Sequence, residues 1–201
     1  MTILVTGFSP FDGRSTNSSW VAASCLKQVI NLQIPVIWGK PSQLLKSAVE
    51  KHQPNIVISM GEGREGRFDI ETVARNERKQ RRDDRGNLPP GLIQPDGPER
   101  RFASIDSTSL SAHMAARQIP IQVSEDAGAF LCEETLYCLE TLKEQFAYLK
   151  TVVFVHLPPY GSSLEYEGRH GFCDDEILAS FANLLLSCTK KVHAESRSLV
   201  E

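Results

Sequence analysis

Residues 136–156 read LYCLETLKEQFAYLKTVVFVH and contain the two sequence patterns that decide the fold. In the first part, apolar residues recur at spacings of three and four, which predicts an amphipathic helix. They are Leu136, Leu139, Leu142, Phe146 and Leu149. The β-branched and aromatic run from Val152 to His156 follows after two residues and predicts a strand. A helix that leads directly into a strand is typical of α/β proteins.

The same alternation of strands and helices extends over most of the chain. The expected strands cover residues 3–6, 35–38, 56–58, 120–123 and 152–156. The expected helices cover residues 17–30, 41–52, 106–117, 132–149 and 174–190. We therefore expect a single α/β domain over residues 1–201, with a mostly parallel twisted sheet and helices on both faces, as in phosphorylase/hydrolase-like three-layer sandwiches. The polar tail after Lys191 is expected to fray.

Residues 61–102 interrupt this pattern, because they carry many charges, several Gly and Pro residues and little apolar periodicity. A loop of that length inside a compact domain is usually functional or mobile. Its basic side chains are interleaved with acidic ones and have no aromatic neighbours for stacking on bases. They are Arg75, Arg78, Lys79, Arg81, Arg82 and Arg85. We interpret this cluster as a solvated loop, with Arg81 as a possible exception.

Composition excludes several classes of protein. The chain is 41% hydrophobic and 23% charged, as in soluble globular proteins, and its formal net charge of −3 gives no general attraction to nucleic acid or anionic membranes. No apolar run is long enough to span a bilayer, and the N-terminus lacks the pattern of a secretory leader, so we expect a cytoplasmic protein. The sequence leaves open whether several copies assemble.

The five cysteines have no C-x-x-C spacing and are expected to be free thiols in a reducing compartment. His170 and Cys173 are the one pair of candidate metal ligands, and two ligands are too few for a metal site, so no metal is expected. No other cofactor is expected either. The remaining histidines outside the expected strands are interpreted as surface residues. They are His52, His113 and His193, together with His170.

Cys132 follows a strand and a turn of small residues and falls at the start of the strongest predicted helix. The unpaired N–H groups and partial positive charge of a helix N-terminus favour thiolate over thiol, and the same N–H groups can hold an oxyanion. A cysteine in this position can also be purely structural. Cys138 lies too deep in the same helix to benefit and is expected to be packed.

His156 ends a predicted strand, and functional sites of parallel α/β folds collect at the carboxyl ends of strands. A histidine there can act as the base for a cysteine at the end of a neighbouring strand. An acidic residue usually orients such an imidazole, and composition alone leaves both Glu71 and Asp69 as candidates.

Four segments between Thr6 and Pro158 resemble, in order, the motifs of the pyroglutamyl peptidase I family, also called pyrrolidone-carboxyl peptidases. They are Thr6–Phe11 (TGFSPF), Glu71–Asn76 (ETVARN), Ser124–Cys132 (SEDAGAFLC) and Phe154–Pro158 (FVHLP). The resemblance implies a cysteine omega-peptidase that removes an N-terminal pyroglutamyl residue from peptides. In such an enzyme Cys132 is the nucleophile, His156 moves the proton and Glu71 orients the histidine.

The resemblance also implies the surroundings of the reacting groups. The backbone N–H of Cys132 and the side chain of Arg81 would stabilise the oxyanion. Four apolar residues would hold the lactam ring, namely Phe8 and Phe11 on one side with Phe130 and Leu131 on the other. An apolar slot suits this small neutral ring and rejects a charged N-terminus, since burying an unpaired ammonium is costly.

Residues 60–67, MGEGREGR, depart from the family's glycine-rich G-x-A-G-G-R stretch. This departure leaves a second interpretation open. In it the chain has the same fold but is not a peptidase, and it acts on or binds another cyclic amide. A third reading treats Gly61–Gly66 as a G-x-G-x-x-G fingerprint of a dinucleotide-binding oxidoreductase. That fingerprint must open an amphipathic helix, which the polar residues after Gly66 do not predict.

Overall fold

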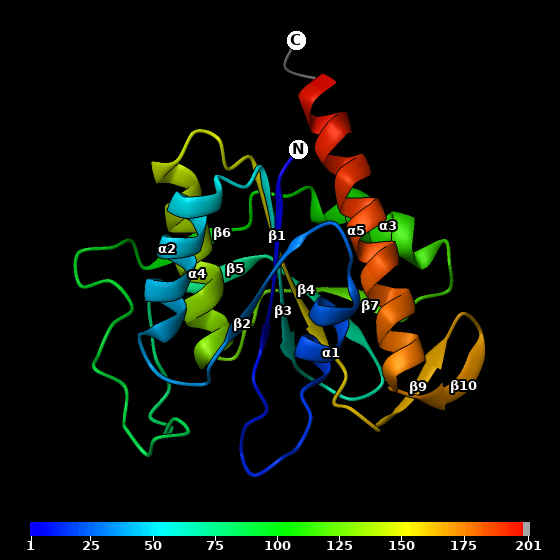
Figure 1. Ribbon diagram of the computed structural model, residues 1–201, viewed down its shortest axis with the longest axis horizontal. Coiled ribbons are helices and arrows are strands. Elements are labelled where there is room, and N and C mark those ends of the chain that lie inside the picture. The colour runs from blue at the N-terminus through cyan, green and yellow to red at the C-terminus, as the bar shows by residue number, and fades with distance from the viewer. Residues whose placement is uncertain (199–201) are drawn as a thin grey trace.

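The computed structural model describes residues 1–198 and consists of one α/β domain built on a six-stranded sheet (Figure 1). Four of the five strand pairings are parallel, and only β4 runs antiparallel to its neighbour β8. The expected α/β class with a mostly parallel sheet is therefore confirmed. In spatial order the strands are β2 (Ile30–Ile34), β1 (Ile3–Phe8), β3 (Ile56–Glu62), β8 (Thr151–Leu157), β4 (Phe68–Glu71) and β7 (Ile121–Ser124).

Helices cover both faces of the sheet and make three layers (Figure 1). One face carries α1 (Ser18–Cys25), α3 (Ser107–Ala115) and α5 (Asp175–Ser198), and the other carries α2 (Lys40–His52) and α4 (Leu131–Gln145). Alternate residues of the central strands divide between two cores, as the period of a strand requires. In β1, Val5 packs under α1 and α5, whereas Leu4 packs under α2 and α4.

Short strands interrupt the region that was predicted to be one long loop. Residues 61–102 contain β4 and a small hairpin of β5 (Val73–Arg75) with β6 (Arg100–Phe102). A second hairpin, β9 (Ser163–Tyr166) with β10 (Arg169–Phe172), also carries no strong sequence signal. These strands have three or four residues each, too few for a periodic pattern to be visible.

The prediction near the N-terminus is wrong in the second strand. The helix expected over residues 17–30 ends at Cys25, because Leu26 is extended and Gln28 has a left-handed backbone with φ 60°. The strand then begins at Ile30 and ends at Ile34, so the strand predicted over residues 35–38 is instead a turn that leads into α2. The start of helix α1 is as predicted, since the side chain of Asn17 caps this helix.

The ends of two long helices also differ from prediction. Helix α4 ends at Gln145, but Phe146 and Leu149 still pack against the same core as the helix. Helix α5 continues past Lys191 to Ser198, where the sequence predicts a frayed tail, and residues 199–201 lie outside the described part. His193 is not a surface residue, because it is buried in α5 and its Nδ1 lies 2.7 Å from Thr151 Oγ1.

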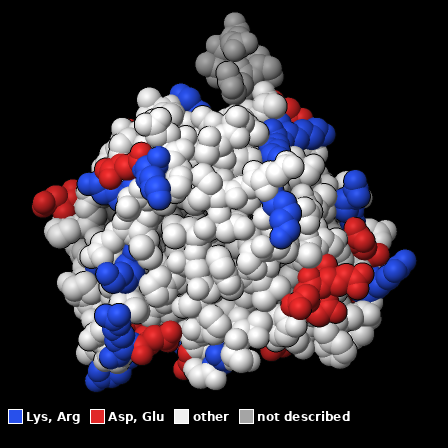
Figure 2. Space-filling model, viewed as in Figure 1, with Lys and Arg blue, Asp and Glu red and all other residues white. Residues whose placement is uncertain are grey.

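Charges are distributed around the periphery of the face seen in Figure 2, where basic and acidic side chains are interspersed and the centre is uncharged. This face offers no broad surface of one sign. Among residues 1–198, no helix combines the length and apolar character that crossing a membrane requires.

Strand β4 is anchored by aromatic packing. Phe68 is fully buried and stacks on Phe181 of α5, with ring centroids 3.8 Å apart and an interplanar angle of 9°. Since removal of a buried aromatic ring leaves a cavity, we expect Phe181→Ala to lower the free energy of unfolding by about 3–5 kcal/mol in denaturant titrations. The matched control is Phe172→Ala on the exposed β10, which should change it by less than about 0.5 kcal/mol. Equal effects of the two substitutions would contradict this assignment of the core.

Candidate active site

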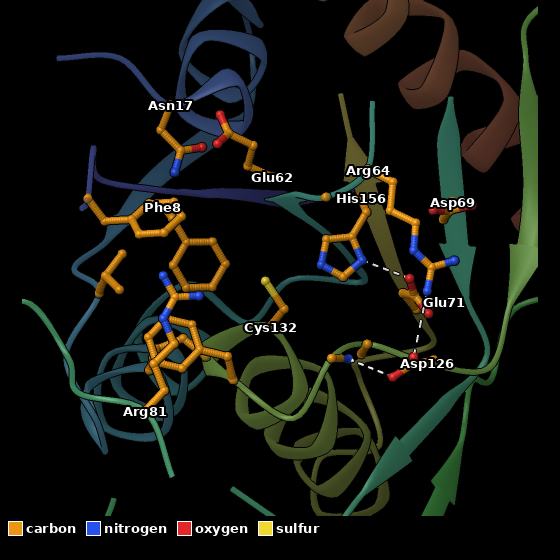
Figure 3. A pocket seen from close by; sticks show the side chains of 17 residues that line it. Phe8, Asn17, Glu62, Arg64, Asp69, Glu71, Arg81, Asp126, Cys132 and His156 are labelled. Carbon is orange, nitrogen blue, oxygen red and sulfur yellow. Dashed lines mark hydrogen bonds and ion pairs between the residues drawn. The ribbon is translucent and has the colours of Figure 1, made fainter. Parts of the chain in front are cut away.

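A pocket of about 230 Å³ opens at the carboxyl ends of β3 and β8, next to the start of α4 (Figure 3). Every residue that the sequence singled out for the site lines it. They are Phe8, Phe11, Glu71, Arg81, Phe130, Leu131, Cys132 and His156. Strand β4 runs antiparallel to β8 and therefore enters the site from the opposite direction, and its pairing with β8 sets Asp69 opposite His156.

His156 is buried between an acidic group and a thiol. Its Nδ1 lies 2.7 Å from Glu71 Oε1, and Cys132 interacts with the same imidazole. Burial opposes the charged imidazolium, but the interactions with Cys132 and then with Glu71 stabilise it more strongly and raise the pKa of His156 to about 10. Because Nδ1 faces Glu71, Nε2 is the nitrogen that remains for the cysteine and a substrate.

The structure distinguishes the two acidic candidates that the sequence left open. Asp69 is buried on the same strand as Glu71, but its carboxylate forms an ion pair with Arg67, with Nε and Oδ1 3.0 Å apart. Glu71 is the carboxylate that contacts the imidazole.

Cys132 is half-buried and lies in the first turn of α4, whose N-cap residue is Phe130. The turn that leads to it has a left-handed backbone at Gly128 and Ala129, with φ values of 88° and 55°. The buried carboxylate of Glu133 accepts hydrogen bonds from the backbone N–H groups of Ala129 and Arg75, so it fastens this turn to β5. A side chain in the first turn of α4 thus holds the turn before Cys132 in place.

Gly61 and Gly63 make room for the reacting groups. A Cβ atom on Gly61 would lie 2.7 Å from Cys132 Sγ and 3.2 Å from His156 Cδ2, and one on Gly63 would lie 2.6 Å from His156 Cβ. Only glycine therefore permits β3 to pass this close to the cysteine and the histidine. Strand β3 extends through Glu62 and the next element is the strand β4, so Gly61–Gly66 opens no helix and the dinucleotide-binding reading is wrong.

The side of the pocket away from Glu71 is apolar. Phe8 and Leu131 are buried, and Phe11, Phe130 and the unforeseen Val36 complete this wall. The guanidinium of Arg81 lies 4.6 Å from the centre of the Phe130 ring and 5.7 Å from that of Phe11. Its Nη2 is 3.3 Å from Asp12 Oδ2, so Arg81 lies over the rings of the apolar wall on the Phe8 side of Cys132 (Figure 3).

Several lining residues escaped the sequence reading because nothing local distinguishes them. Buried Asn17 caps α1, and Glu62 accepts hydrogen bonds from the backbone and side chain of Ser18 and pairs with Arg14. Arg64 and Asp126 lie at the mouth of the pocket. The capping position of Asn17 was predicted, and the other three lie within the segments 60–67 and 124–132 that the sequence singled out, but no pattern assigned any of the four to the pocket.

The other four cysteines lie outside the pocket. Burial raises the pKa values of Cys138 and Cys173 to about 12, and it raises those of Cys25 and Cys188 as well, so these thiols stay protonated. In the part of the chain that the structure describes, no three His, Cys, Asp or Glu side chains are grouped to hold a metal ion.

Comparison with known proteins connects this geometry to one family. A family model described as pyroglutamyl peptidase matches residues 1–174. A pyrrolidone-carboxylate peptidase from Enterobacter sp. (strain 638) is 36% identical over 167 residues, which cover 78% of this chain and 77% of that relative. One from Lactobacillus acidophilus is 31% identical over 180 residues, covering 85% of this chain and 89% of the relative.

Solved structures share the complete fold. The crystal structure of pyroglutamyl peptidase I from Bacillus amyloliquefaciens matches with a TM-score of 0.82 and 26% identity, covering 96% of this chain and 97% of that one. A mutant pyrrolidone carboxyl peptidase from Pyrococcus furiosus has the same TM-score of 0.82 at 23% identity and covers 96% of this chain. At the latter identity the likeness concerns the fold alone.

The close approach at Gly61 can be tested directly. We expect Gly61→Ala to reduce catalytic turnover by about 10²-fold or more, because the added methyl group displaces the thiol or the imidazole by a large fraction of an ångström. Circular dichroism and thermal unfolding should show that the variant still folds.

The matched control is Gly171→Ala in β10, where a Cβ atom would meet its nearest neighbour, Ile177 Cδ1, at an ordinary 3.8 Å. That variant should keep full turnover. A fully active Gly61→Ala enzyme would show that the cysteine and histidine do not need this space.

Proposed function

This chain belongs to the pyroglutamyl peptidase family, and on that premise we propose that it is a cysteine peptidase that hydrolyses the amide bond after an N-terminal pyroglutamyl residue. The observation that carries the proposal is the 2.7 Å hydrogen bond of buried His156 to Glu71, with Cys132 on the other side of the same imidazole. This is the arrangement of nucleophile, base and orienting carboxylate that acyl transfer requires.

The pocket suits the lactam ring of pyroglutamate. Apolar side chains, including those of Phe8, Phe130 and Leu131, line one side of the pocket and would pack against the small neutral ring. An unmodified N-terminus would bring an ammonium group onto this wall next to the Arg81 guanidinium, which is electrostatically unfavourable. Peptides with an N-terminal pyroglutamate are thus the substrate class that the pocket favours.

The unusual residues of the 60–67 segment do not disturb this pocket. Met60 is fully buried and packs in the core under α1 and α5, on the face of β3 away from Cys132. Glu65 is exposed and does not line the pocket, whereas Gly61 and Gly63 keep the space that the site needs. The peptidase reading is therefore favoured over a non-peptidase member of the same fold.

In the first step the Cys132 thiolate attacks the pyroglutamyl carbonyl carbon, and a carbon–sulfur bond forms as the carbonyl oxygen becomes an oxyanion. We expect the first-turn N–H groups of α4, including that of Cys132, to stabilise this charge. Arg81, which also lines the pocket, is the second expected donor. His156 Nε2 then protonates the leaving amine as the carbon–nitrogen bond breaks.

In the second step neutral His156 removes a proton from water, and the resulting hydroxide adds to the thioester carbonyl. The carbon–sulfur bond breaks, pyroglutamate leaves, and the Cys132 thiolate and His156 imidazolium are restored. Glu71 keeps Nδ1 protonated throughout and stabilises the imidazolium. The cytoplasm is the proposed location, because all five cysteines are free thiols, as a reducing compartment maintains them.

The assignment of the nucleophile predicts a simple assay. Purified protein should release a fluorescent amine from a pyroglutamyl arylamide, and a thiol alkylator should abolish release. We expect Cys132→Ala to be inactive and Cys132→Ser to retain little activity, since a serine hydroxyl is a far weaker nucleophile near neutral pH. Cys25→Ala is the matched control and should keep both the activity and its sensitivity to the alkylator. Full activity in either Cys132 variant would refute the cysteine mechanism.

The role of Glu71 predicts a shift in the pH profile. His156 must be protonated to donate to the leaving amine, and its raised pKa keeps it so until the pH approaches about 10. Because Glu71→Gln removes one of the groups that raise this pKa, the alkaline limb of kcat/KM should move towards neutral pH and turnover should fall by about 10²-fold. Asp69→Asn should move this limb much less, since Asp69 pairs with Arg67. An unmoved alkaline limb in Glu71→Gln would exclude this role for Glu71.

A further inference from the structure

One end of the pocket is charged, and the proposed reaction uses only His156 and Glu71 of this end. In Figure 3, Phe8 and Arg81 lie on one side of Cys132, whereas His156, Arg64 and Asp126 lie on the other. With the lactam ring on the apolar side, the amine must leave on the side of His156, which protonates it. The residue that follows pyroglutamate therefore extends over the charged end.

Most charged groups at this end already have partners inside the protein. Two carboxylates there have side chains that are 5% exposed or less, and each forms an ion pair. The pairs are Asp69 with Arg67 and Glu71 with His156. Such groups have little capacity to contact a peptide.

Arg64 and Asp126 differ from these pairs. Their side chains are 59% and 62% exposed, and Arg64 Nη2 lies 3.7 Å from Asp126 Oδ2, well beyond the usual length of a charge-assisted hydrogen bond. Arg64 comes from the segment between β3 and β4, and Asp126 comes from the turn that precedes Cys132. The two side chains thus face each other loosely across the mouth of the pocket.

We propose that Arg64 and Asp126 contact the residue that follows pyroglutamate and set the preference of the enzyme for the charge of that residue. The inference rests on the proposed peptidase function and adds a subsite to it. Arg64 attracts an acidic side chain at this position and Asp126 attracts a basic one. Since the two opposite charges lie close together, they offset each other, and the intact enzyme accepts acidic, neutral and basic residues.

This balance makes the two single substitutions opposite in effect. Loss of Arg64 leaves the negative charge of Asp126 unopposed, which favours a basic residue. Loss of Asp126 leaves Arg64 unopposed and favours an acidic one. A contact between exposed charges changes a binding equilibrium by about 1.4-fold to fivefold. Each substitution weakens the binding of a substrate with one charge at this position and strengthens the binding of a substrate with the opposite charge, so the two effects multiply.

The experiment compares three pyroglutamyl dipeptide amides whose second residue is alanine, aspartate or lysine. The C-terminal amide removes the free carboxylate, so only the side chain carries charge. The quantity of interest is the ratio of kcat/KM for the aspartate substrate to that for the lysine substrate. Arg64→Gln should lower this ratio by about two- to 25-fold and Asp126→Asn should raise it by a similar factor.

Two further variants serve as controls. The double variant Arg64→Gln with Asp126→Asn should return the ratio close to that of the unmodified enzyme. Glu65→Gln removes an exposed charge next to Arg64 that does not line the pocket, and it should leave the ratio unchanged. Added salt should diminish the shifts of the single variants, because it screens exposed charges.

The outcomes separate this inference from the function on which it rests. If no variant, nor the unmodified enzyme, cleaves the alanine substrate, the peptidase proposal itself fails. If the alanine substrate is cleaved and the ratio stays constant in both single variants, Arg64 and Asp126 do not contact this residue. A uniform decrease for all three substrates in Asp126→Asn would also overturn the inference, because it would mean that Asp126 acts only by accepting the hydrogen bond from Gly128 N–H.

Discussion

The placement of a buried imidazole between the side chains of Cys132 and Glu71 is the constraint on which the rest of the site depends. An isolated charge in this position would be costly, but Cys132 and Glu71 together stabilise the imidazolium, and its pKa rises in spite of the burial. The three side chains come from α4, β8 and β4. The antiparallel insertion of β4 beside β8 is what brings the carboxylate to the histidine. A sheet with only parallel neighbours for β8 would not supply it in this way.

The surroundings of these three groups serve to hold them close together. Strand β3 has glycine where any side chain would collide with the thiol or the imidazole, and Glu133 fastens the turn before Cys132 to the small β5–β6 hairpin. The hairpin, the turn and β3 belong to segments far apart in the sequence. Their convergence at one end of the sheet creates a pocket with an apolar side and a charged side, which matches a neutral lactam joined to a variable peptide.

The sequence predicts the elements with many residues and strong periodicity, and it fails where structure depends on distant partners. Helix α4 and strand β8 are predicted because each buries a regular apolar face. Strand β2 was misplaced, since its pairing with β1 selects residues 30–34, which include two polar residues, over the more apolar residues 35–38. Short β4 has no pattern of its own, and its place in the sheet follows from β8 and β7.

The same limit applies to the site. The strand end and the helix start indicated His156 and Cys132, but the sequence alone could not choose between Glu71 and Asp69, which lie two residues apart on one buried strand. The glycines of residues 61–66 fit a phosphate-binding pattern locally, and only the fold reveals that Gly61 and Gly63 face a thiol and an imidazole. Arg64 and Asp126 are exposed charges, and their proposed role follows only from their position in the fold, on the side where the amine leaves.

The central claim is that His156, held between Cys132 and Glu71, is an imidazolium at neutral pH. Nitrogen-15 NMR of the His156 ring tests it most directly, because the chemical shifts of Nδ1 and Nε2 report whether each nitrogen is protonated. The account predicts that both nitrogens are protonated at neutral pH and that the ring titrates far above the ordinary histidine value of about 6.5. A ring that is neutral at neutral pH and titrates near that ordinary value would contradict it.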